Sequence, residues 1–264
     1  MKNKLRLGIV PYMNAKPLIY ELNQHADSIE LSFEVPSLLP SMLNNDQIDV
    51  AIIPSIEYFR SGNYAIIPDI SISSYGTVES VKIFSKVAIQ NIRTAALDKN
   101  SLTSCALTKI ILREQYHLSP HYTQWNGQYD ISGTHADAVL LIGDNAMKIT
   151  DDEYITLDLG QAWFEYTGLP FVYAVWAVKK DRRIPGINKL LKTAKEAGIR
   201  SVWELATTES HRLRLPQERC LNYLINSIRY NLGKEEIKGL QTFYQHAMSL
   251  GLAPKGVEII FNET

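Results

Sequence analysis

The first part of the chain alternates between strand and helix patterns, and this alternation constrains the fold more than any other feature. Apolar or alternating runs predict strands at Leu5–Val10, Ile29–Val35 and Asp49–Ile53, with helical segments at 17–23 and 36–45 between them. A strand–helix–strand–helix–strand order implies parallel strands joined by right-handed crossovers. The chain is therefore predicted to adopt an α/β fold.

A second set of strands and helices follows. The predicted segments are extended runs at 64–72 and 78–85, strands at 94–97, 138–142, 154–157 and 171–178, and helices at 102–116, 159–166, 187–197, 216–232 and 235–249. A single full-length domain is one interpretation, but two α/β lobes fit the two sets better. The chain would cross between lobes near residues 86–90 and 171–178. Residues 1–88 and 171–264 would then form one lobe, and 89–170 the other, with a ligand cleft between them.

Composition and charge argue against several classes of protein. The 264 residues are 45% hydrophobic and carry a net charge of −1, so no basic field favours nucleic acid. No apolar run reaches membrane-spanning length, and polar residues at 11–16 interrupt the apolar core that a signal peptide would need. We expect a cytoplasmic protein in which Cys105 and Cys220 are buried and reduced.

Three predicted strand-to-helix turns carry small polar side chains: Tyr12–Asn14, Pro54–Ser55 and Asn100–Ser104. The free N–H groups and the dipole of a helix N-terminus both attract anions, so these turns suit a carboxylate ligand. The third turn is the richest, because Ser101, Thr103 and Ser104 all carry hydroxyls. Helix capping by Asn14 or Ser101 is the alternative, since both residue types are common caps.

Other polar residues are weaker candidates. Ser80 lies at the start of the extended run 81–84, in a hydroxyl-rich segment for which a surface turn is the alternative. Asp144 and Asn145 follow a buried strand, where they face the cleft or cap the next turn. Glu57 and Glu79 lie near the predicted cleft, although solvated carboxylates are far commoner than catalytic ones.

Motifs for metal, phosphate or nucleophilic chemistry are absent from the sequence. His117 and His121 lack a third ligand nearby, and no metal site is expected there. No phosphate-binding loop, zinc-spaced cysteine pair or Gly-x-Ser-x-Gly motif occurs. The residues alone indicate a two-lobed protein that binds a small anion, and they do not decide between an enzyme and a binding protein.

Several stretches go further, because together they resemble the signatures of the menaquinone-pathway chorismate dehydratases. They are Leu7–Leu18, Asp49–Tyr58, Val78–Lys86, Ala96–Ser104, Asp137–Ala146, Leu157–Gly160, Trp163 and Pro170–Val172. The resemblance covers nearly the whole chain in order. It implies a type II periplasmic-binding-protein-like fold in a cytoplasmic enzyme that converts chorismate to 3-[(1-carboxyvinyl)oxy]benzoate and water. It implies no metal or organic cofactor.

Matching positions in these motifs suggest roles for single residues. Asn14 would hydrogen-bond the departing hydroxyl, and Ser80 would orient a substrate carboxylate. The hydroxyls of the third turn would hold a carboxylate, with further binding candidates at Tyr12, Ser55, Asp144 and Asn145. No strong protein base stands out in the motifs, so our hypothesis is that a carboxylate of the substrate accepts the proton.

Three other functions compete with this interpretation. The 1,4-dihydroxy-6-naphthoate synthase of the same pathway shares the implied fold, but its N-terminal signature differs from the pattern at 11–14. A solute-binding protein of an importer would carry a secretion signal or an N-terminal lipid-anchored cysteine. An effector-binding domain of a regulator would normally follow a DNA-binding helix-turn-helix. The small-molecule substrate is the only partner that the sequence predicts.

Overall fold

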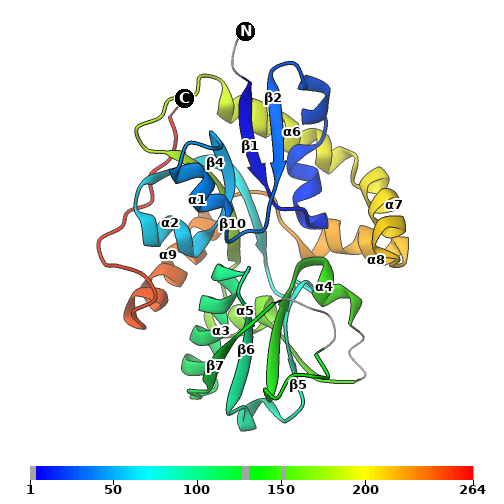
Figure 1. The fold of residues 1–264 in the computed structure, drawn as a ribbon, viewed down its shortest axis with the longest axis vertical. Helices are drawn as coiled ribbons and strands as arrows, with labels where there is room; N and C mark the ends of the chain where they lie inside the picture. The colour runs from blue at the N-terminus through cyan, green and yellow to red at the C-terminus, as the bar shows by residue number, and fades with distance from the viewer. Residues whose placement is uncertain (1–3, 127–130, 150–152, 264) are drawn as a thin grey trace.

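The protein contains two five-stranded sheets, one above the other in Figure 1, in a computed structural model that describes residues 4–126, 131–149 and 153–263. The first sheet has the order β2-β1-β3-β10-β4 and the second has the order β7-β6-β8-β5-β9. The first comprises β1 (Leu5–Ile9), β2 (Ile29–Phe33), β3 (Val50–Pro54), β4 (Tyr64–Ser74) and β10 (Phe171–Lys179). The second comprises β5 (Val81–Ser85), β6 (Thr94–Asp98), β7 (His121–Trp125), β8 (Ala138–Ile142) and β9 (Ile155–Asp158).

Both sheets mix parallel and antiparallel pairs. The predicted parallel arrangement of the first three strands is confirmed, because β1 pairs in parallel with both β2 and β3. β10 pairs antiparallel with β3 and β4, although it comes from much later in the chain. In the second sheet, β6 is parallel to β7 and β8, whereas β5 is antiparallel to β8 and β9.

The chain changes sheets earlier than the sequence suggested. β5 pairs with β8 and β9, so the first change lies between Ser74 and Val81 and not near residues 86–90. The second change lies between Asp158 and Phe171. The division into lobes at 1–88, 89–170 and 171–264 stays a prediction.

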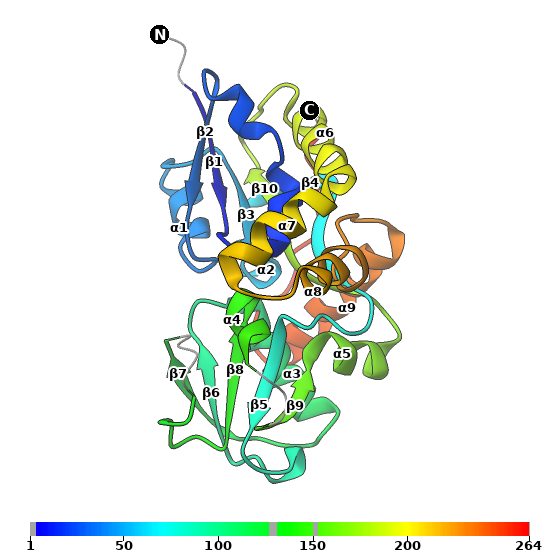
Figure 2. The ribbon, with the colours of Figure 1, turned by 90° about the vertical axis from the view of Figure 1, so that its right-hand side faces the viewer.

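Helices cover both sheets (Figures 1 and 2). They are α1 (Leu39–Asn44), α2 (Ser55–Ser61), α3 (Leu102–Glu114), α4 (Gly143–Lys148), α5 (Leu159–Thr167), α6 (Ile187–Arg200), α7 (Val202–Leu213), α8 (Gln217–Asn222) and α9 (Lys234–Ser249). Short 3₁₀ segments are η1 (Met13–Ile19), η2 (Leu22–His25) and η3 (Ile89–Asn91), and Tyr223–Ser227 forms one π-helical turn, η4.

Several elements differ from the sequence-based expectation. The segment predicted as a helix at 17–23 forms η1 and η2, because Pro17 lies inside it and cannot donate a helical hydrogen bond. The predicted helix at 216–232 ends at Ser227. We did not predict β7, α4 or α7: β7 is an edge strand whose side chains are largely exposed, and α7 contains Val202 and consecutive threonines, which are poor helix formers.

The contact between α6 and η1 is close and depends on Gly198. A Cβ added at Gly198 would lie 2.0 Å from the backbone oxygen of Pro17, so no larger side chain fits there without movement. α6 therefore supports the turn that contains Asn14.

The two cysteines are unpaired, with Cys220 buried and Cys105 half-buried. Among the described residues, no helix is long and apolar enough to cross a membrane. The same part of the chain holds no group of three or more His, Cys, Asp or Glu side chains arranged to bind a metal.

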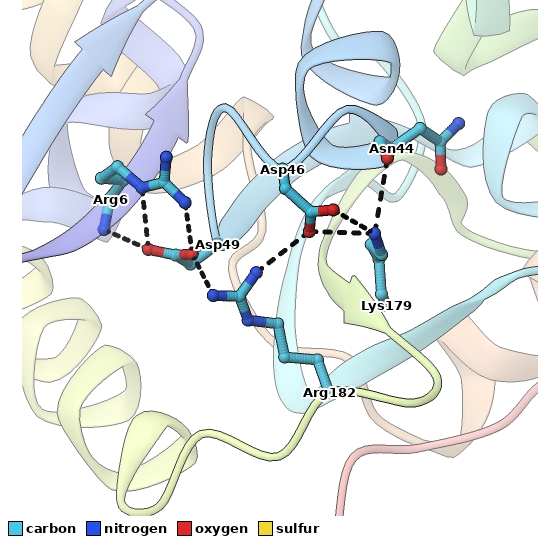
Figure 3. Close-up of polar contacts among 6 residues, drawn as sticks. All are labelled: Arg6, Asn44, Asp46, Asp49, Lys179 and Arg182. Atoms are coloured by element: carbon cyan, nitrogen blue, oxygen red, sulfur yellow. Dashed lines mark hydrogen bonds and ion pairs between the residues drawn. The ribbon is translucent and has the colours of Figure 1, made fainter.

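An ion-pair network lies at the edge of the first sheet where β1 begins (Figure 3). The buried carboxylate of Asp49 accepts hydrogen bonds from the backbone N–H and the guanidinium of Arg6 and pairs with Arg182 at 2.7 Å. Arg182 also contacts Asp46, which pairs with Lys179. Burial raises the pKa of Asp49, but the hydrogen bonds from Arg6 and the charge of Arg182 outweigh it and hold the pKa below its usual value.

We predict that Asp49→Asn lowers the free energy of unfolding by about 1–3 kcal/mol near neutral pH. Because the pKa of Asp49 is lowered by folding, the wild-type advantage is complete above the unfolded pKa of about 3.9 and disappears as the pH falls through the folded value. Urea denaturation from about pH 3 to about pH 7 measures this difference. The exposed Asp27→Asn is the control, and a pH-independent difference would contradict the assignment.

Candidate functional site

A pocket is lined by residues of both sheets and lies where β1, β3 and β8 end. It contains about 570 Å³ of space free of atoms, including its part open to solvent. Six of the predicted site residues line it: Tyr12, Asn14, Ser80, Ser101, Thr103 and Ser104. Segments far apart in sequence thus meet at one cavity.

The pocket lining has no formal charge. Among the described residues that line it, none is Lys, Arg, His, Asp or Glu. Its titratable groups are Tyr12 and Tyr173, and burial, aided by the charge of nearby aspartates, raises the pKa of both phenols. The pocket therefore offers hydroxyls, an amide and backbone N–H groups within a mainly apolar wall.

Asn14 does not cap the helix that follows β1. Tyr12 occupies the N-cap position of η1, and Asn14 is the second residue inside the helix. Its side-chain oxygen Oδ1 is buried and has no hydrogen-bond partner among the described residues. A buried acceptor without a partner costs about 1–3 kcal/mol, which a hydrogen bond to this oxygen would offset.

Ser80 is completely buried and is held by its neighbours. Its carbonyl accepts the N–H of Gly143 at 2.7 Å, and its Oγ accepts the hydroxyl of Tyr223 at 2.7 Å. Tyr223 lies in the π-turn η4, and we did not identify it from the sequence. Tyr223 itself is not among the residues that line the pocket.

The N-terminus of α3 opens into the same pocket. Ser101 occupies the N-cap position, but its side chain makes no capping hydrogen bond, so simple capping by its hydroxyl is not observed. Thr103 Oγ1 accepts the N–H of Ile56 at 3.3 Å. The N–H of Cys105 bonds Ser101, as expected for the first intrahelical bond, and the N–H groups before it point along the helix axis. They give this end of α3 a partial positive charge.

The other predicted binding residues lie outside the pocket lining. Ser55 is buried, and its hydroxyl donates to the carbonyl of Val172 at 2.7 Å. Asn145 is half-buried and does not line the cavity. Neither is brought to the cavity by this structure.

Asp144 links the two halves of the molecule. Oδ1 accepts the N–H of Met13 at 3.0 Å, and Oδ2 pairs with the guanidinium of Arg212 at 2.6 Å. Arg212 also pairs with Glu209. Asp144 follows a strand of the second sheet, whereas Met13 follows β1 of the first, so this carboxylate fixes the turn that carries Asn14.

Gly143 makes a second close contact across the pocket. It has a φ of +60°, and an added Cβ would lie 2.9 Å from the ring of Tyr12. Glycine is required here for both reasons, because other L-residues are strained at positive φ. The ring of Tyr12 therefore lies directly on the backbone at the start of α4.

The comparisons with known proteins assign the family. A family model described as menaquinone biosynthesis matches residues 5–249. The chain belongs to this family. It is 30% identical over 267 aligned positions to a chorismate dehydratase from Thermus thermophilus, covering 94% of this chain and 96% of the relative. A chorismate dehydratase from Campylobacter jejuni is 26% identical and is covered over 99% of its length.

Solved structures of other proteins have the same fold as this member of the menaquinone-biosynthesis family. A protein from Archaeoglobus fulgidus matches with a TM-score of 0.71 at 19% identity, over 94% of this chain and 98% of that one. The alkanesulfonate-binding protein of Xanthomonas axonopodis matches with a TM-score of 0.69 at 16% identity, over 96% and 94%. The predicted periplasmic-binding-protein-like fold is confirmed.

The glutamates and histidines that we considered lie elsewhere. Glu57 pairs with Arg60 at 2.8 Å, and Glu79 accepts the hydroxyl of Ser227 at 2.7 Å. None of Glu57, Glu79, His117 and His121 lines the pocket.

Sequence reasoning missed the residues that support the site. A tyrosine inside a predicted helix, such as Tyr223, has no spacing that distinguishes it from a core residue. Asp158 did have a signal, because it precedes a helix as a cap would. It accepts the N–H of Gln161 in α5 and those of Val78 and Glu79 beside Ser80.

We predict that Asp144→Ala lowers the free energy of unfolding by about 2 kcal/mol or more, because Met13 and Arg212 both lose a buried acceptor. Asp144→Asn should cost less, since an amide oxygen still accepts the N–H of Met13. Urea denaturation of both variants measures the two effects. Unchanged stability in Asp144→Ala would contradict the linking role.

Proposed function

We propose that the protein is a chorismate dehydratase, a hydro-lyase that removes water from chorismate to give 3-[(1-carboxyvinyl)oxy]benzoate. Its family membership and two dehydratase relatives support this activity. The observation that carries the proposal is an uncharged pocket with Asn14 and Ser80 on its wall and the N-terminus of α3 opening into it. The cytoplasmic location predicted from the sequence belongs to the same proposal.

Chorismate carries two carboxylates, and the pocket supplies neutral donors for them. The N-terminus of α3, with Ser101, Thr103 and Ser104, suits one carboxylate, because its N–H groups and dipole favour negative charge. Ser80 then orients the other carboxylate. The side chain of Tyr12 would then pack against the ring of chorismate.

The reaction is a 1,2-elimination that makes the ring aromatic. The carbon bearing the enol ether loses its proton, and the electrons of that C–H bond form the new C=C bond. The hydroxyl on the neighbouring carbon leaves with the C–O electrons and, once protonated, becomes water. The side-chain amide of Asn14 can hydrogen-bond this hydroxyl and fix the direction of the C–O bond before it breaks.

The neutral lining supports a substrate carboxylate as the base. Burial holds the pKa of Tyr12 and Tyr173 well above the usual value, so their phenolates are not available near neutral pH. An arginine or lysine beside the carboxylate would lower its pKa and weaken it as a base, whereas desolvation among neutral groups raises its pKa. A pocket without cations therefore favours proton transfer to the substrate itself.

We predict that Asn14→Ala and Ser80→Ala each reduce kcat for chorismate by about 10²-fold or more, with a smaller change in KM, because both groups act on the reacting part of the substrate. Chromatography and mass detection of the aromatic enol ether measure turnover. Ser55→Ala is the matched control, since its hydroxyl serves the fold. Binding losses alone at Asn14 and Ser80 would contradict their catalytic role, and no turnover by wild type would contradict the function.

We predict that kcat/KM stays flat from about pH 6 to about pH 9, because no lining group has an ordinary pKa in that range. The raised pKa values of Tyr12 and Tyr173 keep both phenols protonated throughout it. Initial rates across this range measure the profile. A change in kcat/KM with a midpoint near pH 7 would contradict this prediction if free chorismate does not itself titrate there. Such a change would indicate a protein base.

A further inference from the structure

Tyr223 occupies an unusual piece of backbone behind the site. It begins η4, a single π-helical turn that follows α8 directly, and its side chain is 1% exposed. π-turns inside helices are rare and frequently occur at functional sites. This turn brings the phenol hydroxyl to 2.7 Å from Ser80 Oγ.

The Tyr223 hydroxyl lies against Ser80, one of the two residues that we place at the reacting bonds. Burial raises the pKa of Tyr223, while the side chains of Ser80 and Asn14 act in the opposite direction. Burial prevails, so the phenol stays neutral at working pH. A neutral phenol has one hydrogen to donate, and it donates that hydrogen to Ser80.

This bond determines where the Ser80 hydroxyl can point. A serine hydroxyl accepts through its lone pairs and donates through one hydrogen. Because Oγ accepts the phenol hydrogen of Tyr223, which does not line the pocket, the hydrogen of Ser80 remains available for a group inside it. Without the phenol hydroxyl, Ser80 could rotate its hydrogen away from the ligand.

The backbone of Ser80 is held by other contacts. Glu79 adopts a positive φ of 63°, which is uncommon outside glycine. Its carboxylate accepts the hydroxyl of Ser227 at the end of the same π-turn, and its N–H donates to Asp158 at 2.8 Å. Removing the phenol hydroxyl therefore changes the orientation of the Ser80 hydroxyl without removing these supports.

We propose that Tyr223 is a positioning residue for catalysis, whose hydroxyl aligns Ser80 without touching the substrate. This inference rests on the proposed dehydration of chorismate. It excludes Tyr223 as an acid, because proton loss would leave a buried phenolate.

The test is Tyr223→Phe, which removes one hydroxyl and keeps the ring. We expect kcat for chorismate to fall about 3- to 10-fold, the range for one hydrogen bond, with little change in KM. Tyr230→Phe is the matched control. Tyr230 is also buried, lies outside the pocket lining, and its hydroxyl has no hydrogen-bond partner among the described residues. Thermal unfolding of both variants gives the folded fraction to which kcat is normalised.

A double-mutant cycle separates positioning from a general structural effect. If Tyr223 acts through Ser80, Tyr223→Phe should have much less effect in a Ser80→Ala background than in wild type. An undiminished effect there, or unchanged kcat in the single variant, overturns the inference. A wild-type protein that does not convert chorismate would instead overturn the proposed function, so the two failures are distinguishable.

Discussion

The hydrogen bond from Met13 to Asp144 is the contact on which the site depends most. It joins the turn after β1 of the first sheet to the start of α4, which follows β8 of the second sheet, next to the lining residues Asn14 and Gly143. Arg212 holds the same carboxylate from α7. The turn that carries Asn14 is therefore positioned by both sheets and by the C-terminal helices, which makes the pocket a property of the whole chain.

The second constraint is electrostatic. An anion in a neutral pocket loses hydration and receives only partial charges in return, from hydroxyls, an amide and the end of α3. Such binding is weaker than pairing with arginine would be. It leaves the carboxylate basic, however, and basicity is what the proposed elimination requires of it. Affinity and reactivity thus oppose each other, and the uncharged lining favours reactivity.

Local patterns predicted the parts of the fold that have local causes. The first parallel strands follow from periodicity, and Ser101 occupies the cap position that its residue type indicates, whereas Tyr12 and not Asn14 takes that position in η1. The resemblance added Ser80. Tyr223 and the bridging role of Asp144 depend on contacts between residues far apart in sequence, 143 positions for Tyr223 and Ser80. No local pattern encodes such a distance. The early change of sheets was missed because an extended run has no signal for its partner.

The order of strands in the two sheets has a consequence for how the protein assembles. The second sheet uses only residues 81–158, so all its strands are present once that stretch has been synthesised. The first sheet has a gap between β3 and β4 until β10 arrives at residues 171–179. Synthesis from the N-terminus therefore permits the strands of the second sheet to pair before those of the first sheet are complete. The first sheet is completed later, when β10 is synthesised and pairs between β3 and β4.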